Sequence, residues 1–335
     1  MVHRLTLDVR AENFAYAKPF RIAGHVFLQS PVVEVRLSDG LHVGRGEGGG
    51  VFYLNDDVAA MTAAIEHARA AIEGGLSRAA LQEALPPGGG RNALDCALWE
   101  LESKASGVPV WKLAGLSPPR PLRTTFTLGA DDPAVMARGA VETFPDARAL
   151  KLKLTGDLDL DIVRVEAVRA ARPDCWIGVD ANQGYAIADL AALVRAMERW
   201  DIRLIEQPLA RGREADLDGF ASPIPIAADE SILSLADIEA MPGRFDVVNI
   251  KLDKCGGLTE ALAMARRARA LGLGVMVGNM MGTSLATAPA YLVGQYCDVV
   301  DLDGPTFLAA DRQPGIAYRD GDIECSDAVW GHLAA

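Results

Sequence analysis

The chain of 335 residues lacks the features that build covalent, metal-bound or membrane scaffolds. Its five cysteines are scattered, odd in number and without CxxC spacing, which favours isolated reduced thiols over a disulfide or zinc framework. No apolar run approaches the roughly 20 residues that a membrane-spanning helix needs. The N-terminus has no apolar signal core. We therefore expect a cytoplasmic protein.

An excess of positive charge is also missing. The formal net charge of −12 argues against nucleic acid or an anionic membrane surface as the main partner. It leaves small substrates open, because a buried pocket can differ in sign from the outer surface. A chain of this length, half of it hydrophobic, can bury a large core without cross-links. We expect one large domain with a smaller partner.

The first part of the chain has the pattern of a small α+β unit. Residues 1–50 alternate between apolar and polar types, and Asp39-Gly40 between two apolar runs predicts a hairpin turn. The pattern becomes helical over 56–85 and again over 92–106, with a break at the sequence PPGGG between them.

From about residue 123 the pattern changes to short apolar runs that alternate with amphipathic helical stretches. Eight runs follow one another: TTFTL, ALKLKL, WIGVDAN, IRLIEQP, PIAADE, DVVNIKLD, GVMVGNM and CDVVDLDG. Eight βα units over about 190 residues favour a closed barrel over a doubly wound open sheet. We predict an α/β fold, a (β/α)₈ TIM-like barrel with an N-terminal α+β capping domain. The predicted parts are 1–118 (cap), 119–308 (barrel) and 309–335 (C-terminal segment).

Charged residues end six of the predicted barrel strands. Strand ends of this kind form the barrel mouth, where active sites of this fold are built. Alternate residues of a strand share a face, so three close pairs are each expected to point one way: Lys151 with Lys153, Lys251 with Asp253, and Asp301 with Asp303. A single such residue is commonly a loop residue or a helix cap. The whole set favours an active site, because inward-facing charges must be paired or bind something.

Three carboxylates, of Asp180, Glu206 and Asp229, end consecutive predicted strands. Neighbouring carboxylates repel one another unless a cation lies among them. Oxygen ligands without His or Cys favour Mg²⁺, with Mn²⁺ as a substitute. An incompletely coordinated ion leaves positions for substrate oxygens and acts as a Lewis acid. These residues are the predicted metal ligands.

Two lysines, Lys153 and Lys251, belong to predicted strands 2 and 6, which lie opposite each other in an eight-stranded ring. A substrate held between them would present one face to each amine. A lysine acts as a base only when its amine is neutral in a useful fraction of the molecules. Burial and positive neighbours lower its pKa, whereas carboxylates raise it. We predict that both lysines are catalytic.

This set of residues suits proton transfer at a carbon next to a carboxylate. Deprotonation there produces an enediolate, whose charge the metal and Lys151 would stabilise. Reprotonation by the opposite lysine inverts the centre. A leaving group would turn the same chemistry into elimination, and a ring-closing donor would turn it into cycloisomerisation. Two lysines favour 1,1-proton transfer, and the other two reactions stay open.

Several motifs together resemble the enolase superfamily, in its muconate-lactonizing-like branch, over nearly the whole chain. They occur in order: KLK (151–153), DAN (180–182), EQP (206–208), ADES (228–231) and NIKLDKCGGLTEA (249–261). Three longer stretches are similar to the dipeptide epimerases, especially the L-Ala-D/L-Glu epimerase group: RNALDCALWEL (91–101), IKLDKCGGLTEALA (250–263) and DLDGPTFLA (301–309).

The resemblance implies an isomerase whose metal binds the terminal carboxylate of a dipeptide, while Asp301 and Asp303 receive the dipeptide's ammonium. It also implies that the C-terminal segment returns to the cap and that two cap loops close over the substrate. Muconate cycloisomerase, o-succinylbenzoate synthase and N-acylamino acid racemase activities are the alternatives on this scaffold. The expected partner is a small-molecule dipeptide. A homo-oligomer is possible on this sequence, and the pathway in which the enzyme acts stays open.

One departure concerns the first cap loop. The L-Ala-D/L-Glu epimerases have an arginine there that pairs with the glutamate side chain, and the sequence KPFRIAGHVF (18–27) places Gly24 at that point. Glutamate specificity is therefore open, and a side chain that is apolar, aromatic or otherwise different is expected at least as strongly. His25 in this loop and Tyr53 in the second cap loop are candidate substrate contacts.

Further candidates lie around the predicted mouth. Thr127, at the end of the first barrel strand, and Met280, after the seventh, are candidate substrate contacts. Three polar residues are expected to orient the catalytic groups without touching substrate: Asn182, Glu230 and Asp253.

Overall fold

The computed structural model describes residues 4–22 and 25–332, with the side chains of Ile22 and His25 excepted. Its centre is a sheet of eight parallel strands in the order β12-β11-β10-β9-β8-β7-β6-β5. The edges meet where the backbone N–H of Thr125 donates to the carbonyl of Val300 at 2.9 Å. The predicted barrel is confirmed. Its strands are β5 (Phe126–Leu128), β6 (Ala149–Lys153), β7 (Trp176–Asp180), β8 (Ile205–Glu206), β9 (Ile226–Ala228), β10 (Val247–Lys251), β11 (Gly274–Gly278) and β12 (Val299–Asp301).

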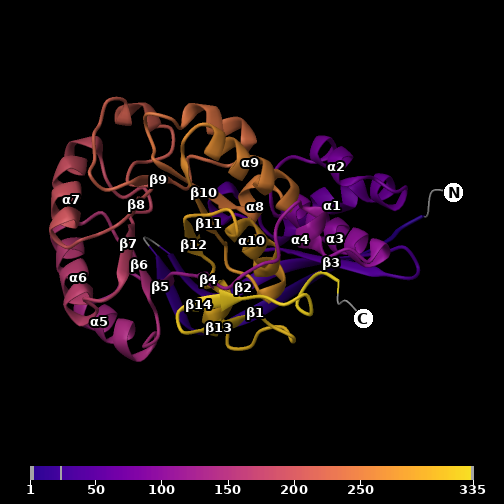
Figure 1. The fold of residues 1–335 in the computed structure, drawn as a ribbon, viewed down its shortest axis with the longest axis horizontal. Helices are drawn as coiled ribbons and strands as arrows, with labels where there is room; N and C mark the ends of the chain where they lie inside the picture. The colour runs from indigo at the N-terminus through magenta and orange to yellow at the C-terminus, as the bar shows by residue number, and fades with distance from the viewer. Residues whose placement is uncertain (1–3, 23–24, 333–335) are drawn as a thin grey trace.

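Helices cover the outside of the barrel, as Figure 1 shows for the helices after β5, β6 and β7. Short 3₁₀ helices replace full α-helices after β8 and β9. None of the helices in the described ranges is long and apolar enough to cross a bilayer. The barrel helices are α5 (Pro133–Glu142), α6 (Leu158–Ala171), α7 (Ile187–Arg199), η2 (Glu214–Leu217), η3 (Leu235–Ala240), α8 (Leu252–Cys255), α9 (Leu258–Ala270), α10 (Ser284–Gly294) and η4 (Gly304–Phe307).

The cap is an antiparallel sheet, in the order β1-β2-β3, packed against helices. The Asp39-Gly40 turn lies between β2 and β3, as predicted. The stretch with a helical pattern over 56–85 forms two helices, and Gly75 between them has a φ of +90° that an α-helix does not allow. The cap elements are β1 (Thr6–Ile22), β2 (His25–Ser38), β3 (Val43–Gly48), η1 (Phe52–Leu54), α1 (Val58–Glu73), α2 (Arg78–Ala84), α3 (Gly89–Ser106) and α4 (Val110–Leu113).

Short polar side chains start many of these helices. The side chain at the N-cap accepts a hydrogen bond from a backbone N–H of the first turn, which otherwise has no partner. These capping residues are Asp57, Ser77, Asp132, Asp157 and Thr283. Local sequence therefore determines where these helices begin. In the barrel it thereby determines where the loop that follows a strand ends.

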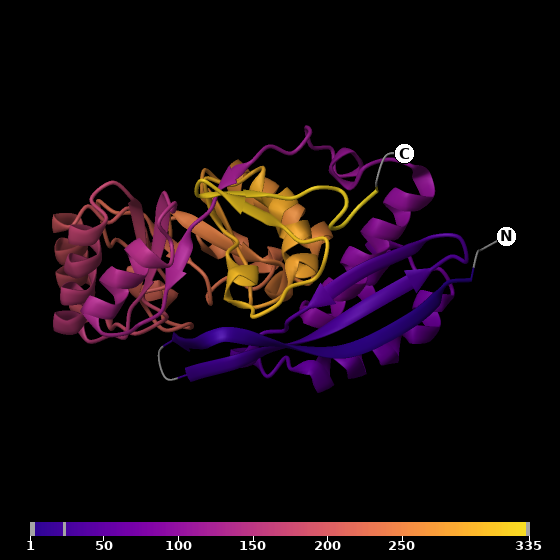
Figure 2. The same cartoon turned by 90° about the horizontal axis from the view of Figure 1, so that it is seen from below.

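The hairpin of β1 and β2 reaches from the cap across one end of the barrel (Figure 2). It is attached there by an isolated bridge between Tyr16 and Leu308, and the N–H of Ala309 donates to the carbonyl of Ala15 at 2.8 Å. A register shift between Ala15 and Phe20 precedes the hairpin's outer part. Segments from the start and the end of the chain thus meet beside the barrel mouth.

The C-terminal segment contacts both the barrel side and the cap. Strands β13 (Ala317–Arg319) and β14 (Asp322–Glu324) form a small sheet with β4 (Leu122–Arg123). Arg312 pairs with Glu47 of β3 at 2.9 Å, and the indole N–H of Trp330 donates to the carbonyl of Arg45 at 2.9 Å. These contacts agree with a segment that returns to the cap, while the two boundaries between the three predicted parts stay predictions.

Glycines let strand β3 lie directly on helix α3. Gly44, Gly46 and Gly48 alternate along the strand, so they share the face that meets the helix. A Cβ atom added at Gly46 would lie 2.0 Å from the carbonyl oxygen of Ala93 and 2.8 Å from the backbone nitrogen of Ala97. This close approach determines where the loop after β3, which leads to η1, enters the barrel mouth.

We expect Gly46→Ala to lower the free energy of unfolding by about 3 kcal/mol, because a methyl group at this position overpacks backbone against backbone. Gly139→Ala is the matched control. A Cβ there meets only the end of the Leu128 side chain, at 3.2 Å. Alanine in that helix should be neutral or slightly stabilising. Denaturant unfolding followed by circular dichroism measures both, and equal stabilities of the two variants would contradict the packing argument.

Candidate active site and metal centre

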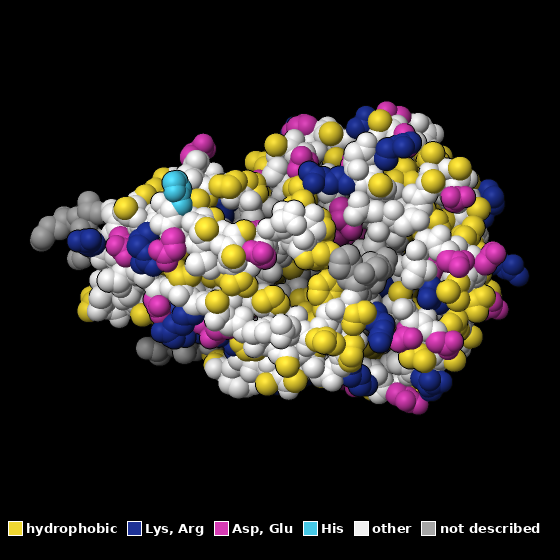
Figure 3. All heavy atoms as spheres, turned by 180° about the vertical axis from the view of Figure 1, so that it is seen from behind, with side chains coloured by type: hydrophobic (Ala, Val, Ile, Leu, Met, Phe, Trp, Pro, Cys, Tyr) yellow, Lys and Arg dark blue, Asp and Glu magenta, His cyan; other side chains and the backbone are white. Residues whose placement is uncertain are grey.

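A cavity opens at the C-terminal ends of the barrel strands and is covered by the cap. Figure 3 shows hydrophobic side chains gathered around a hollow in the middle of one face, with many charged side chains toward the edges. Most of the residues predicted to form the site line this cavity. They are Tyr53, Thr127, Lys151, Lys153, Asn182, Asp229, Glu230, Lys251, Met280, Asp301 and Asp303. The strand ends predicted to carry the chemistry are therefore brought together.

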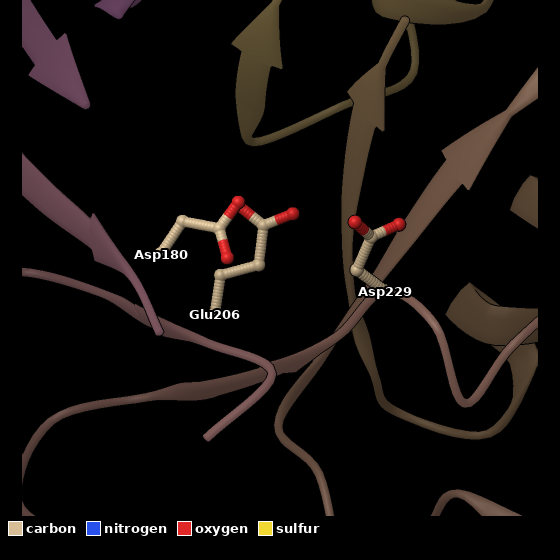
Figure 4. Close-up of side chains that lie close together, drawn as sticks. All are labelled: Asp180, Glu206 and Asp229. Carbon is tan, nitrogen blue, oxygen red and sulfur yellow. The ribbon is translucent and has the colours of Figure 1, made fainter. Parts of the chain in front are cut away.

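The three acidic residues at the ends of β7, β8 and β9 lie next to one another. Asp180, Glu206 and Asp229 are buried, and each offers a carboxylate oxygen within 4.8 Å of the others. Figure 4 shows the three carboxylates turned toward one shared space. Three anionic groups so close together repel strongly in a medium of low dielectric constant. The arrangement therefore requires positive charge within the same space.

The acidic triad suits a divalent cation. Oxygen Oε2 of Glu206 is buried and has no hydrogen-bond partner among the described residues. Burial, together with the charge of Asp180, raises the pKa of Glu206 to about 8. A hard cation would remove both costs, because Oε2 could coordinate it and its charge would favour the ionised carboxylate. The donor set of three carboxylates, without His or Cys, fits Mg²⁺.

Side chains that the sequence analysis did not single out hold the triad in place. Asn249 of β10 donates to Oε1 of Glu206 at 2.7 Å, and Gln207 accepts the backbone N–H of Asp229 at 2.9 Å. The Nζ of Lys254 lies 2.5 Å from Oδ1 of Asp229. Asn249 and Lys254 belong to the NIKLDK motif, and membership of that motif is the sequence feature that could have identified them as site residues. Their partners became visible only in three dimensions.

The two predicted catalytic lysines lie on opposite sides of the ring, on β6 and β10, which are four strands apart. The Nζ of Lys153 donates to Oδ2 of Asp180 at 2.5 Å, and that of Lys251 donates to Oδ2 of Asp229 at 2.7 Å. Burial by itself lowers the pKa of Lys251, but the carboxylates of Asp229 and Glu206 outweigh it and raise that pKa above its usual value. Of the opposing influences expected from the sequence, the carboxylates therefore prevail at Lys251.

A second group of charges lies at β12, across the ring from the acidic triad. Lys151 pairs with Asp301, and its Nζ lies 3.6 Å from Oε2 of Glu206. The backbone N–H of Thr127 donates to Oδ2 of Asp303 at 2.6 Å. Burial and the neighbouring Asp301 raise the pKa of Asp303 to about 7. No lysine or arginine in the described ranges forms an ion pair with Asp303.

Asp253 departs from its expected position. Strand β10 ends at Lys251, and Asp253 lies in the short helix α8, so the two do not share a strand face. Its Oδ1 accepts the N–H of Gly49 and the side-chain amide of Asn92, both at 3.0 Å. Asp253 therefore ties the cap loop after β3 to the barrel, and it forms no hydrogen bond with Lys251.

The remaining candidates lie around the rim. The amide of Asn182 reaches Glu230 at 3.5 Å, and burial with the charge of Asp229 raises the pKa of Glu230 to about 7. The hydroxyl of Tyr53 is buried without a hydrogen-bond partner among the described residues. Gly24 lies outside the described residues, and of His25 only the backbone, at the start of β2, is described.

Two family models match the chain. The model described as mandelate racemase / muconate lactonizing enzyme, N-terminal domain, matches residues 4–115. The model described as enolase C-terminal domain-like matches residues 134–328.

Curated and solved relatives cover nearly the whole chain. An L-Ala-D/L-Glu epimerase of Escherichia coli (strain K12) is 38% identical over 95% of this chain and 99% of its own length. A crystal structure of an Agrobacterium tumefaciens enolase family member with bound sodium and L-Ala-L-Glu has a TM-score of 0.94. It is 40% identical and covers 98% of this chain and 100% of its own. The dipeptide epimerase of Enterococcus faecalis V583, complexed with Mg and L-Leu-L-Tyr, has a TM-score of 0.90. It is 28% identical and covers 98% of this chain and 100% of its own.

We expect Glu206→Gln to weaken Mg²⁺ binding by at least about 10-fold, because it removes a negative ligand, and Asn249→Ala to weaken it less by freeing that ligand to turn away. Asp201→Asn is the control, since Asp201 is exposed and Asn tolerates its φ of +51°. Titration calorimetry with Mg²⁺ measures all three. An unchanged affinity in Glu206→Gln would contradict the assignment of the metal site.

Proposed function

The chain belongs to the enolase superfamily, in the mandelate racemase / muconate lactonizing enzyme family, and on that premise we propose that it is a Mg²⁺-dependent dipeptide epimerase. The observation that carries the proposal is the opposition of Lys153 and Lys251 across the acidic triad, with Asp301 and Asp303 on the remaining side. A location in the cytoplasm is part of the proposal, supported by five free cysteines.

The acidic triad holds the ion in this mechanism. Bound Mg²⁺ supplies Lewis-acid stabilisation to the substrate carboxylate and a positive field that favours a neutral lysine. The buried amine of Lys151, 3.6 Å from Oε2 of Glu206, adds a fixed cation beside the oxygens on which charge grows. Lys254 and Asn249 keep Asp229 and Glu206 in position.

The two opposed lysines move the proton. One of them, neutral, takes the α-proton of the C-terminal residue through Nζ and becomes an ammonium. The α-carbon becomes planar as the electron pair moves into the carboxylate. The opposite lysine, as an ammonium, delivers a proton from Nζ to the other face, and the centre is inverted. Lys153 and Lys251 exchange these roles between the two directions of the reaction, since they face opposite sides of the same carbon.

The carboxylates at β12 favour a dipeptide over an N-acylated amino acid. Asp303 is buried, accepts the N–H of Thr127, and forms no ion pair with the described residues. A substrate ammonium would satisfy it, whereas an acyl group would leave the carboxylate buried without a cation. Muconate cycloisomerase and o-succinylbenzoate synthase substrates carry no ammonium either, so this pair disfavours them for the same reason.

The reaction class is tested by incubation of L-Ala-L-Xaa dipeptides with enzyme and Mg²⁺ in D₂O. We expect one deuterium at the α-carbon of the C-terminal residue in both diastereomers, measured by mass spectrometry and NMR, because Lys153 and Lys251 exchange protons with solvent. No new ultraviolet chromophore should appear, since nothing is eliminated. Exchange of N-acylamino acids with none in dipeptides would contradict the proposed substrate class.

The roles of the lysines are tested by Lys153→Ala and Lys251→Ala. Each variant should lower the rate of epimerisation by about 10³-fold or more, because one of the two faces loses its acid/base group. The remaining lysine should still exchange the α-proton of one diastereomer and not the other, which a purely structural defect would not produce. Lys112→Ala, at an exposed position, is the control. Full epimerisation in either variant would rule out the two-lysine mechanism.

A further inference from the structure

The positions of the lysines determine how the planar intermediate stands in the barrel. Its two faces must meet Lys153 on β6 and Lys251 on β10, which lie opposite each other. The plane therefore stands across the line between them and contains the barrel axis. Within that plane the carboxylate lies toward the triad on β7 to β9, and the amide nitrogen lies toward Asp301 and Asp303 at β12. The third substituent, the side chain of the epimerised residue, must run along the barrel axis.

The barrel below the site is filled. A separate buried cluster consists of inward-facing residues that precede the site residues on the same strand faces. Its members are Leu204, Ala227, Val247 and Met276, with Trp176 and Val299 packed against them. Leu204 lies two residues before Glu206, and Ala227 two before Asp229, so each shares the face of its acidic neighbour. The side chain of the epimerised residue therefore points away from this cluster, toward the cap.

The surface that the side chain would meet is aromatic. We call Phe20, Phe27, Phe52 and Tyr53 the cap wall; all four line the cavity. Phe20 and Phe27 are cross-strand partners near the end of the β1–β2 hairpin. The ring centroids of Phe27 and Phe52 lie 5.3 Å apart, as do those of Phe52 and Tyr53.

Barrel residues complete this apolar surface. The ring centroids of Phe20 and Phe307 lie 4.8 Å apart, and Met280 and Met281 also line the cavity. The aromatic contacts therefore run from the hairpin to the barrel loop after β12.

The cap contributes no charge to the cavity in the part of the chain that the structure describes. Its described lining residues are aromatic, small or neutral polar, and every charged lining residue comes from the barrel. The register places Arg21 opposite Val26, on the face turned away from Phe20 and Phe27. Arg21 is exposed and does not line the cavity. A carboxylate or ammonium held against the cap wall would lose water without gaining an ion pair.

We propose that the residue epimerised carries an apolar side chain, aliphatic or aromatic, and that Phe27 with the rest of the cap wall selects it. The inference rests on the proposed function and adds the substrate class: dipeptides with a free N-terminus and an apolar C-terminal residue. The aromatic rings bury apolar surface of the substrate side chain and offer no partner to a charged one.

The ranking of substrates is the first test. Deuterium exchange at the C-terminal α-carbon is measured for L-Ala-L-Leu, L-Ala-L-Phe, L-Ala-L-Glu and L-Ala-L-Lys, each with Mg²⁺. We expect kcat/KM for the Leu and Phe dipeptides to exceed that for the Glu and Lys dipeptides by at least about 100-fold, because the described cap residues that line the cavity offer no partner for either charge. A preference for Glu or Lys would overturn the inference and leave the proposed function standing. Absence of exchange in every dipeptide would overturn the proposed function itself.

The second test compares two variants that each add one positive charge, on opposite faces of the hairpin. Phe27→Arg should raise kcat/KM for L-Ala-L-Glu relative to L-Ala-L-Leu by at least about 10-fold, because the guanidinium enters the cavity. Val26→Arg adds the same charge to the adjacent position, whose side chain is 57% exposed and does not line the cavity. It should leave the ratio unchanged. Equal shifts in both variants, or none in a folded Phe27→Arg, would overturn the role of the cap wall.

Discussion

Three buried carboxylates within 4.8 Å of one another are the constraint on which this site depends. Burial of a charge costs several kcal/mol unless a partner compensates it. Lysines of the neighbouring strands and of helix α8 compensate these charges: Lys153 at Asp180, and Lys251 and Lys254 at Asp229. The same compensation places two amines on opposite sides of the ring. The groups that make the triad tolerable are therefore also the groups that the proposed chemistry requires.

The barrel and the cap supply different chemistry to one cavity. Every charged residue that lines the cavity in the described ranges comes from the barrel, and the cap contributes aromatic, small and neutral polar residues. The glycines of β3 bring this strand close to α3, and Asp253 of the barrel accepts hydrogen bonds from Gly49 after β3 and from Asn92 on α3, at 3.0 Å each. Proton transfer and choice of substrate can therefore change separately. The barrel charges must keep their mutual geometry, whereas the cap wall can vary its side chains without disturbing them.

Several features could be predicted from local sequence because they depend on local rules. The eight βα units follow from alternation of short apolar runs and helical stretches, and strand ends in a parallel barrel meet at one mouth. The acidic triad and the opposition of Lys153 and Lys251 follow from strand order alone. The turn at Asp39-Gly40 and the helix N-caps are similarly local, since each depends on a few neighbouring residues.

The tertiary structure decided two kinds of feature. One depends on the residue at which a strand ends, and the other depends on which face of a strand or helix packs against its neighbour. Asp253 looked like a strand neighbour of Lys251, but β10 ends at Lys251, two residues before Asp253, and the helix α8 turns Asp253 toward the cap. The contacts of Asn249 on β10 and Lys254 on α8 with the triad join elements far apart in the sequence, so no local pattern contains them. The register of the β1–β2 hairpin turns Phe27 inward and Arg21 outward. A shift of one residue would reverse this. The sequence by itself therefore determined the fold and the charged residues at the barrel mouth, and only tertiary packing decided the character of the cap wall.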